Sequence, residues 1–276
     1  MPDADSRGLN YRQSEIVSLL RQSGRVVVED LSTQFGVTLQ TIRRDLNELS
    51  DAKLLVRVHG GAIIASGVAN LAYEARQLVA HQHKRLIGEA AARLVPDNAS
   101  LLINIGTTTE EVAKALTSHS GLLVITNNLH VANELHRNKA IEVIVTGGSI
   151  RQGDGGIVGA VTVAQIQQFR VDIAIIGTSA IDSSGTLLDF DVREVEISRA
   201  IIEHARKVVL VADGSKFSRS APVRIAHLSE IDVFVTDRAP SNAIAEMCRK
   251  CEVELIETGG PIEPETVDAQ KTKVEN

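Results

Sequence analysis

Hydrophobic and polar positions alternate along this chain in two different ways. Up to about residue 50, apolar residues recur three or four positions apart, as at Ile16, Leu19 and Leu20, and this spacing predicts short amphipathic helices. From about residue 100, unbroken runs of Val, Ile and Leu alternate with helical stretches, a pattern typical of a mostly parallel sheet covered on both faces. The sequence therefore predicts a small helical domain followed by an α/β domain.

The first domain, residues 1–64, has the pattern of a helix-turn-helix. Helices are expected over residues 12–22, 29–35 and 38–49, with Gly36 as the turn before the third. Thr38 can cap that helix, because its hydroxyl can accept a hydrogen bond from a free backbone N–H. Four apolar side chains fall on one side of the third helix and are expected to pack inward: Leu39, Ile42, Leu46 and Leu49.

The other side of the third helix carries side chains that suit DNA. Arg can bond guanine in the major groove, and Asn or Gln can bond adenine. The residues expected at the DNA are Thr38, Gln40, Thr41, Arg44 and Asn47, with Arg43 on the flank as a phosphate contact. An ordinary surface helix with a polar face is the alternative on this helix alone.

A β-rich run over residues 54–64, broken by Gly60 and Gly61, follows the third helix. It could pair with Val26–Val28 and form the small sheet of a winged domain, with Arg57 and His59 facing the DNA backbone. Alternatively, Arg57 is the solvent-facing position of an alternating strand.

Two motifs in this domain resemble those of a known family. The runs GVTLQTIRRDLNEL (36–49) and LLVRVHGGA (54–62) resemble the amino-terminal winged helix-turn-helix of the DeoR family of bacterial transcriptional regulators. The resemblance implies a repressor that binds double-stranded operator DNA as a homodimer or homotetramer.

The chain from 65 to 80 is small and weakly patterned, and we expect a linker there. Helical spacing resumes with Ile87, Ala90 and Leu94, and a sensor domain is expected over residues 81–258, followed by a disordered tail, 259–276. The strands expected in its sheet are Leu101–Ile105, Leu122–Thr126, Glu142–Thr146, Asp172–Ile176, Val208–Ala212, Asp232–Val235 and Val253–Ile256.

Ligands of such sheets collect outside the carboxyl ends of the strands. Loops there are polar in this sequence, and together they predict a phosphate site, since glycine permits close approach and a helix N-terminus favours an anion. A Thr-rich turn can instead simply cap a helix, and a solvated lysine is the default for Lys216. The residues expected to bind the effector are Gly106, Thr107, Thr108, Thr109, Asn127, Asn128, Gly147, Gly148 and Lys216, with Glu194 among the acids of 189–194 that could complete the polar end.

The same loops are similar to the sensor domain of DeoR-type repressors. The similarity implies a Rossmann-like, ribose-5-phosphate-isomerase-like fold that binds a phosphorylated sugar or polyol. The runs GTLLDFDVREVEISRAII (185–202) and VADGSKFSRS (211–220) are most similar to members that respond to glycerol phosphate, which implies sn-glycerol 3-phosphate as the effector that releases the operator. Family members commonly carry Asp before the Gly-Thr-Thr loop, whereas this chain has Asn104.

A phosphosugar isomerase is the rival interpretation. Aldose–ketose isomerisation needs a general base, for which Glu194 is available. The isomerases, however, place an Asp-Gly-Ala-Asp loop after the strand that here continues Gly177-Thr-Ser-Ala180, so both aspartates are missing. The sequence therefore favours a sensor with no catalytic residues over an enzyme.

Composition indicates where such a protein would work and which cofactors it would need. The 276 residues carry a formal net charge of −6, and the first 65 hold eight Lys/Arg and eight Asp/Glu, so DNA binding must depend on local placement of charge. No apolar run is long enough for a membrane helix or a secretion signal, and a cytoplasmic protein with no membrane partner is expected. The two cysteines, Cys248 and Cys251, form a lone CxxC, which favours neither a zinc nor a redox site, and no cofactor or metal is expected.

Overall fold

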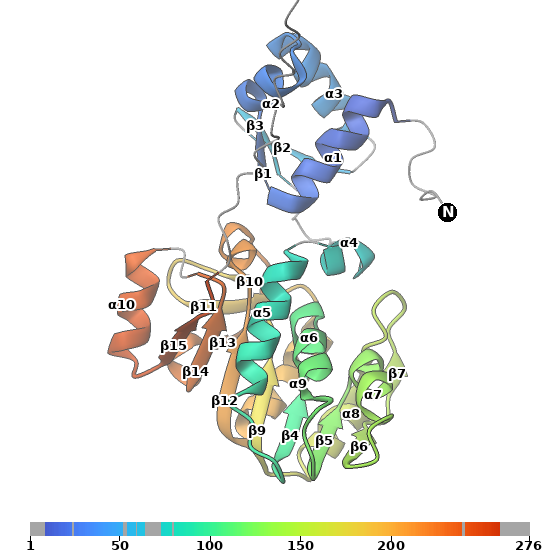
Figure 1. Cartoon of the computed structure of the whole chain (residues 1–276), viewed down its shortest axis with the longest axis vertical. Coiled ribbons are helices and arrows are strands. Elements are labelled where there is room, and N and C mark those ends of the chain that lie inside the picture. The colour runs from blue at the N-terminus through green and yellow to red at the C-terminus, as the bar shows by residue number, and fades with distance from the viewer. Residues whose placement is uncertain are drawn as a thin grey trace, which may run out of the picture.

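The computed structural model describes residues 9–23, 25–51, 54–58, 60–63, 73–78, 80–238 and 241–259. They form an N-terminal helical domain and a larger α/β domain (Figure 1). None of the helices in these ranges is long and apolar enough to cross a membrane. The tail expected to be disordered falls outside the described ranges from residue 260 onward.

The N-terminal domain is a winged helix-turn-helix, as the sequence predicts. Its helices are α1 (Tyr11–Ser23), α2 (Val28–Phe35) and α3 (Leu39–Asp51). Its antiparallel sheet has the order β1-β3-β2, from β1 (Arg25–Val27), β3 (Gly61–Ile63) and β2 (Val56–Val58). Gly36 ends α2 in the left-handed conformation (φ 61°), which glycine adopts without strain.

The inward side of α3 differs from the expected one at two positions. Leu39 is 38% exposed, because it is the first residue of the helix and lies beyond the core. Asp45 is 3% exposed and shares the buried side with Ile42, Leu46 and Leu49. These four lie at i, i+3, i+4 and i+7, so the apolar stripe contains one carboxylate. At the other boundary, Val28 begins α2 rather than ending the strand before it.

The α/β domain is built on a seven-stranded sheet in which all neighbours run parallel, in the order β15-β14-β12-β9-β4-β5-β6. All seven expected strands are present, with ends shifted by up to three residues. Their bounds are β4 Ser100–Ile103, β5 Leu122–Thr126, β6 Ile141–Val145, β9 Val171–Ile176, β12 Ala205–Val211, β14 Val233–Thr236 and β15 Glu254–Glu257.

Helices cover both faces of this sheet, which explains the unbroken apolar runs. In β4, Leu102 packs into the core that contains Ile197 and Ile201, whereas Leu101 and Ile103 pack into the core on the opposite face. The first face is covered by α8 (Ala160–Ile166), α9 (Val192–Glu203) and α10 (Asn242–Lys250), and the second by α5 (His81–Ala92), α6 (Thr107–Leu116) and α7 (Leu129–Leu135).

Smaller elements complete the domain. A three-stranded antiparallel sheet contains β10 (Ala180–Ile181), β11 (Thr186–Asp189) and β13 (Val223–His227), and β7 (Ser149–Ile150) pairs with β8 (Ile157–Val158). Two 3-10 turns, η2 and η3, span Gly214–Ser218 and Leu228–Glu230.

A short helix, α4 (Tyr73–Leu78), forms within the range expected to be a linker, and Figure 1 shows it between the two domains.

Candidate DNA-binding surface and effector pocket

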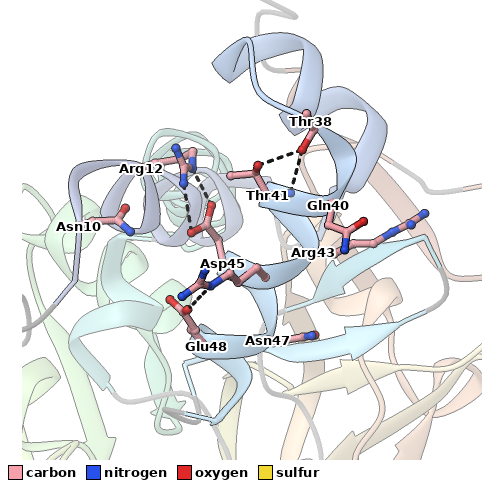
Figure 2. Close-up of a pocket in the computed structure, with 10 residues that line it drawn as sticks. Asn10, Arg12, Thr38, Gln40, Thr41, Arg43, Asp45, Asn47 and Glu48 are labelled. Atoms are coloured by element: carbon pink, nitrogen blue, oxygen red, sulfur yellow. Dashed lines mark hydrogen bonds and ion pairs between the residues drawn. The ribbon is translucent and has the colours of Figure 1, made fainter.

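An open groove of about 720 Å³ runs along α3 and the start of α1 (Figure 2). Six of the eight residues that the sequence assigns to DNA line it: Thr38, Gln40, Thr41, Arg43, Arg44 and Asn47. The remaining lining residues are Asn10, Arg12, Asp45 and Glu48. The recognition face of α3 is therefore one continuous polar surface.

The start of α3 is capped as expected. The Thr41 N–H donates to the Thr38 hydroxyl at 3.2 Å, and the two hydroxyls lie 2.9 Å apart. Beyond the cap, the side chains of Gln40, Arg43 and Asn47 are exposed and project from α3 on the same side in Figure 2. Their exposure leaves them available for the predicted contact with a major groove.

Arg44 is exposed but has a partner within the helix. Its Nε donates to Glu48 Oε1 at 2.9 Å, and the two side chains are 82% and 48% exposed. Glu48 also accepts a hydrogen bond from Gln13 Nε2 at 2.6 Å. An exposed pair one turn apart stabilises a helix by only about 0.3–0.5 kcal/mol, so Arg44 can leave Glu48 for a base.

Of the two wing residues assigned to DNA, Arg57 is described by the structure. Arg57 lies on β2 opposite Ala62 and is half-buried. His59 lies outside the described residues, so its contact with the DNA backbone stays a prediction. Sequence reasoning missed Arg12, which lines the groove and binds Asp45. The signal was available, because an acid inside an apolar stripe needs a cationic partner.

The second site lies where the strand order of the sheet reverses. Strand β4 pairs with β5 on one side and with β9 on the other, so the loops leaving β4 and β9 diverge and open a crevice between them. Two segments and several single residues of the α/β domain line the pocket there, together with Arg76 of α4. They are Ile105–Thr108, Gly177–Ser179, Asp189, Glu194, Val211 and Lys216.

Positive charge gathers at one end of this pocket. Lys216 is 8% exposed, and burial, with the nearby Arg219, lowers its pKa to about 7. Lys84 and Arg76 lower the pKa of Lys216 further, and Asp213 opposes them. The Asp213 side chain is fully buried, lies 3.9 Å from Lys84 Nζ and leaves its Oδ2 without a hydrogen bond. Three basic side chains, Lys84, Lys216 and Arg219, share the one carboxylate of Asp213, so an anion here would favour their charged forms.

Carboxyl groups line the other end. Burial and the neighbouring Asp189 raise the pKa of Glu194 to about 8, even though Arg151 Nη2 lies 2.6 Å from Glu194 Oε2. Arg151 also contacts Asp191 at 3.2 Å. The pocket therefore combines a cationic end with an end that can exchange hydrogen bonds with hydroxyl groups.

Some of the predicted effector residues serve the local backbone instead. Thr109 is fully buried, and its hydroxyl donates to the carbonyls of Asn104 and Gly106. Asn128 caps α7 by accepting from His130 N and Val131 N, and its Nδ2 donates to Glu110. These groups are already satisfied within the fold.

The loops that follow β5 and β6 do not reach the pocket. Asn127 is buried and its Nδ2 donates to the carbonyl of Ile157 at 3.0 Å. Gly147 and Gly148 are exposed beyond β6, the edge strand, which lies two strands from β4. Among the described residues that line the pocket, Gly106, Thr107, Thr108, Glu194 and Lys216 are the predicted ones. Adjacent strand ends were expected to share one cradle, but the crevice opens only at the reversal of strand order.

Asn104, where the family commonly has Asp, has a structural role. It is 2% exposed, its Oδ1 accepts from Gly177 N at 3.0 Å, and its Nδ2 donates to Ser198 Oγ at 3.2 Å. The side chain thus ties the end of β4 to the end of β9 and fixes the floor of the crevice.

Arg76 and Lys84 are the pocket-side cations that sequence reasoning missed. Arg76 lies in the range expected to be a linker, and Lys84 near the start of α5, and no local pattern marks either as functional. Arg76 joins the site because α4 packs beside α6, and Lys84 lies near Asp213 because α5 packs against β12.

No group of three or more His, Cys, Asp or Glu side chains that could hold a metal occurs in the described part of the chain. Cys248 and Cys251 are both free thiols, the first buried.

A winged helix-turn-helix followed by an α/β domain with a polar crevice defines a ligand-sensing transcriptional regulator. Residues 12–68 match the DeoR-like helix-turn-helix domain, and residues 79–238 match the DeoR C terminal sensor domain. The chain belongs to the DeoR family.

Curated relatives resemble this chain over most of its length. The glycerol-3-phosphate regulon repressor of Escherichia coli K12 is 43% identical over 244 residues, which cover 88% of this chain and 97% of that protein. The repressor of the same name from Haemophilus influenzae is 45% identical over 235 residues, covering 85% and 92%. The transcriptional repressor CsqR of E. coli is 37% identical over 247 residues, covering 90% and 95%.

Solved structures are more distant. Ribose 5-phosphate isomerase A from Neisseria gonorrhoeae shares 16% identity, covers 49% of this chain and 53% of its own, and has a TM-score of 0.36. A likeness of this degree says nothing about activity.

Proposed function

We propose that this protein is a transcriptional repressor that binds operator DNA through α3 and releases it when sn-glycerol 3-phosphate occupies the crevice between β4 and β9. The relatives above carry the names of repressors, two of them of a glycerol-3-phosphate regulon. The observation that carries the effector part is the gathering of Lys84, Lys216 and Arg219 around the carboxylate of Asp213, with Arg76 beside Lys216 at the pocket.

The phosphate belongs at the cationic end. Helix α6 begins at Thr107, and the first-turn N–H groups of a helix have no partners within it, so they favour an anion. The Thr107 and Thr108 side chains and Lys216 line the same space. A phosphate dianion there would accept from backbone and hydroxyl donors and restore the charge of Lys216.

The glycerol part belongs at the acidic end. Asp189 and Glu194 line the pocket and are 4% and 7% exposed. With its pKa near 8, the Glu194 carboxyl is mostly protonated at neutral pH and can both donate to and accept from a hydroxyl. The chemistry of a small polyol phosphate therefore suits both ends of the crevice, whose free volume of about 20 Å³ has to widen to admit it.

Effector binding and operator binding are thermodynamically linked, because one assembly contains both the sensor domains and the DNA-binding domains. We infer that the protein acts as a homodimer or homotetramer, because operators with two half-sites need two recognition helices at a fixed spacing. Effector binding that favours another arrangement would weaken operator binding. A coupling of about 1–3 kcal/mol, or roughly 5–150-fold in affinity, is sufficient.

Ligand binding without turnover follows from the same pocket. Thr178 stands in the loop where the isomerases place an acid, and its hydroxyl donates to the carbonyls of Ala180 and Leu188. It cannot act as a base. The carboxyl groups that remain at the pocket are Asp189 and Glu194, and Glu194 is held by Arg151 at 2.6 Å. We infer that the crevice senses a phosphate ester rather than isomerising one.

The test is an operator titration. Operator sequences are first selected from random duplex DNA with the full-length protein. Binding to the selected duplex is then measured at fixed salt with sn-glycerol 3-phosphate, with glycerol and with inorganic phosphate. We expect sn-glycerol 3-phosphate to weaken operator binding and glycerol to have no effect. Unchanged operator affinity at saturating sn-glycerol 3-phosphate would contradict the proposal.

A further inference from the structure

Arg76 connects the effector pocket to the chain segment that leads to the DNA-binding domain. It lies on α4, which follows β3 of the DNA-binding domain through residues 64–72. Its side chain is 12% exposed and lines the crevice together with Thr107 and Lys216. Its Nε is buried with no hydrogen-bond partner. A buried guanidinium N–H that lacks an acceptor, on a side chain that lines a cationic pocket, indicates a place for an anion.

The ion pair that Arg76 makes with Asp154 can break without leaving Asp154 unpaired. Arg76 Nη2 lies 3.0 Å from Asp154 Oδ2. Asp154 is also held by Arg151, whose Nε donates to Oδ1 at 3.0 Å and whose Nη2 donates to Oδ2 at 2.5 Å. If Arg76 leaves, the Asp154 carboxylate keeps both bonds to Arg151. When Arg76 exchanges Asp154 for another anion, no buried charge is therefore left unpaired.

Helix α4 also contacts the rim of the pocket through groups other than the Arg76 guanidinium. The Tyr73 hydroxyl donates to Glu110 Oε2 at 2.7 Å, and its ring stacks on His130 with centroids 4.8 Å apart. The Arg76 carbonyl accepts from Lys84 Nζ and, at 3.5 Å, from the Thr107 hydroxyl. Thr107 lines the pocket, so a ligand that binds its hydroxyl also acts on the backbone of α4.

On its other side α4 contacts α1 of the DNA-binding domain. A change in the position of α4 therefore reaches the DNA-binding domain through this contact.

We propose that Arg76 exchanges Asp154 for the phosphate of the effector, and that this exchange moves α4 and so changes the placement of the DNA-binding domain. The proposal rests on the function proposed above and adds the contact that couples the two sites. Phosphate can bond two N–H groups of a guanidinium at once, and such charge-assisted pairs are the strong hydrogen bonds of proteins. The effector thus makes a contact in one state that it lacks in the other, as any ligand that shifts an equilibrium must.

Two substitutions in the full-length protein test the exchange in opposite directions. Arg76→Gln removes the charged donor, and we expect sn-glycerol 3-phosphate to bind about 10- to 100-fold more weakly in calorimetry, with operator bound normally and retained even at saturating effector. Asp154→Asn weakens the competing partner of Arg76, and we expect the effector to bind several-fold more tightly. Arg85→Gln, at an exposed arginine of α5 that pairs with Glu89, is the matched control and should leave both affinities unchanged.

Hydrogen exchange of the α4 amides gives a readout that a merely structural role would not move. We expect sn-glycerol 3-phosphate to change exchange at Tyr73–Leu78 in the wild-type protein but not in Arg76→Gln, with both proteins melting at similar temperatures. Operator release by Arg76→Gln with the wild-type ratio of affinities would overturn the exchange and leave the proposed function standing. Failure of the wild-type protein to respond to sn-glycerol 3-phosphate would overturn the proposed function and the exchange with it.

Discussion

The guanidinium of Arg12 in α1 lies against the carboxylate of Asp45 in α3, with 2.5 Å between Nε and Oδ2. A second bond joins Arg12 Nη2 to Asp45 Oδ1 at 3.3 Å. The Asp45 side chain is 5% exposed and that of Arg12 is 29% exposed. The pair therefore satisfies an acid inside the apolar stripe of the recognition helix and fixes α1 beside the groove.

Asp45→Ala should destabilise the DNA-binding domain. It removes the partner of Arg12 and leaves a gap beside Ile42 and Leu49, and we expect the free energy of unfolding to fall by about 1–3 kcal/mol, the lower part of that range if solvent reaches the freed arginine. Chemical denaturation followed by circular dichroism measures this change. Asp51→Ala, at an exposed acid of the same helix, is the control and should fall within the error of the wild-type protein. Equal stability of the two variants would show that the pair does not stabilise the domain.

Arg44→Ala should reduce sequence preference. If Arg44 reads a base, selected operator should bind more weakly by about 1–3 kcal/mol, with little change on random DNA. Arg43→Ala serves as the comparison, since a lost phosphate contact weakens both DNAs alike and lowers the salt slope by about one. Equal weakening of operator and random duplex by Arg44→Ala would make Arg44 a phosphate contact instead.

Lys216→Ala should separate sensing from DNA binding. Lys216 lines the effector crevice and is distant in sequence from the DNA-binding domain, so we expect operator affinity to be retained and the response to sn-glycerol 3-phosphate to be lost. Calorimetry and operator titration measure the two properties on one preparation. Normal release of operator by this variant would exclude Lys216 as a phosphate ligand.

Effector affinity should fall as pH rises above about 7. The pKa of Lys216 is lowered to about 7 in the free protein, and a bound dianion would raise it, so binding takes up a proton at pH values between the two. Affinity should therefore be greatest near pH 7 and decline by up to tenfold per pH unit above it. Ionisation of Glu194, whose pKa is about 8, adds negative charge and acts in the same direction.

Calorimetry in buffers with different ionisation enthalpies measures this proton uptake. The Lys216→Gln variant provides the matched comparison, because it cannot bind the proton. An affinity that stays constant from pH 7 to 8.5 would contradict a buried lysine at the phosphate.

Gly88→Ala should destabilise the sensor domain. A methyl group at Gly88 of α5 would lie 2.6 Å from the Glu111 carbonyl carbon and 2.9 Å from Val112 N, both backbone atoms of α6. Forcing the two helices apart typically costs about 1–3 kcal/mol, more than the roughly 1 kcal/mol that alanine gains over glycine in a helix. We expect a lower melting temperature of this domain, whereas Glu89→Ala on the exposed side of α5 should leave it nearly unchanged.

The sequence by itself determined the elements of this protein. Apolar periodicity predicted the ends of α3 to within two residues and the presence of all seven strands of the parallel sheet. It did so because the spacing of apolar residues in an element shows which side of that element is buried. The exposed polar side of α3 followed from the same periodicity, and Thr107 and Lys216 followed from their positions in polar loops after strands. Family motifs then pointed to the kind of ligand.

Only the tertiary structure decided which of these residues meet. The crevice opens between β4 and β9, strands far apart in sequence, so Thr107 and Thr178 face one space while Gly147, beyond the edge strand, does not. Arg76 joins the pocket because α4 packs beside α6, which no local pattern encodes. Asp45 can be buried on the apolar side of α3 because Arg12 of another helix lies against it. Strand order and helix packing arise from burial summed over the whole chain, and they alone bring distant charges together.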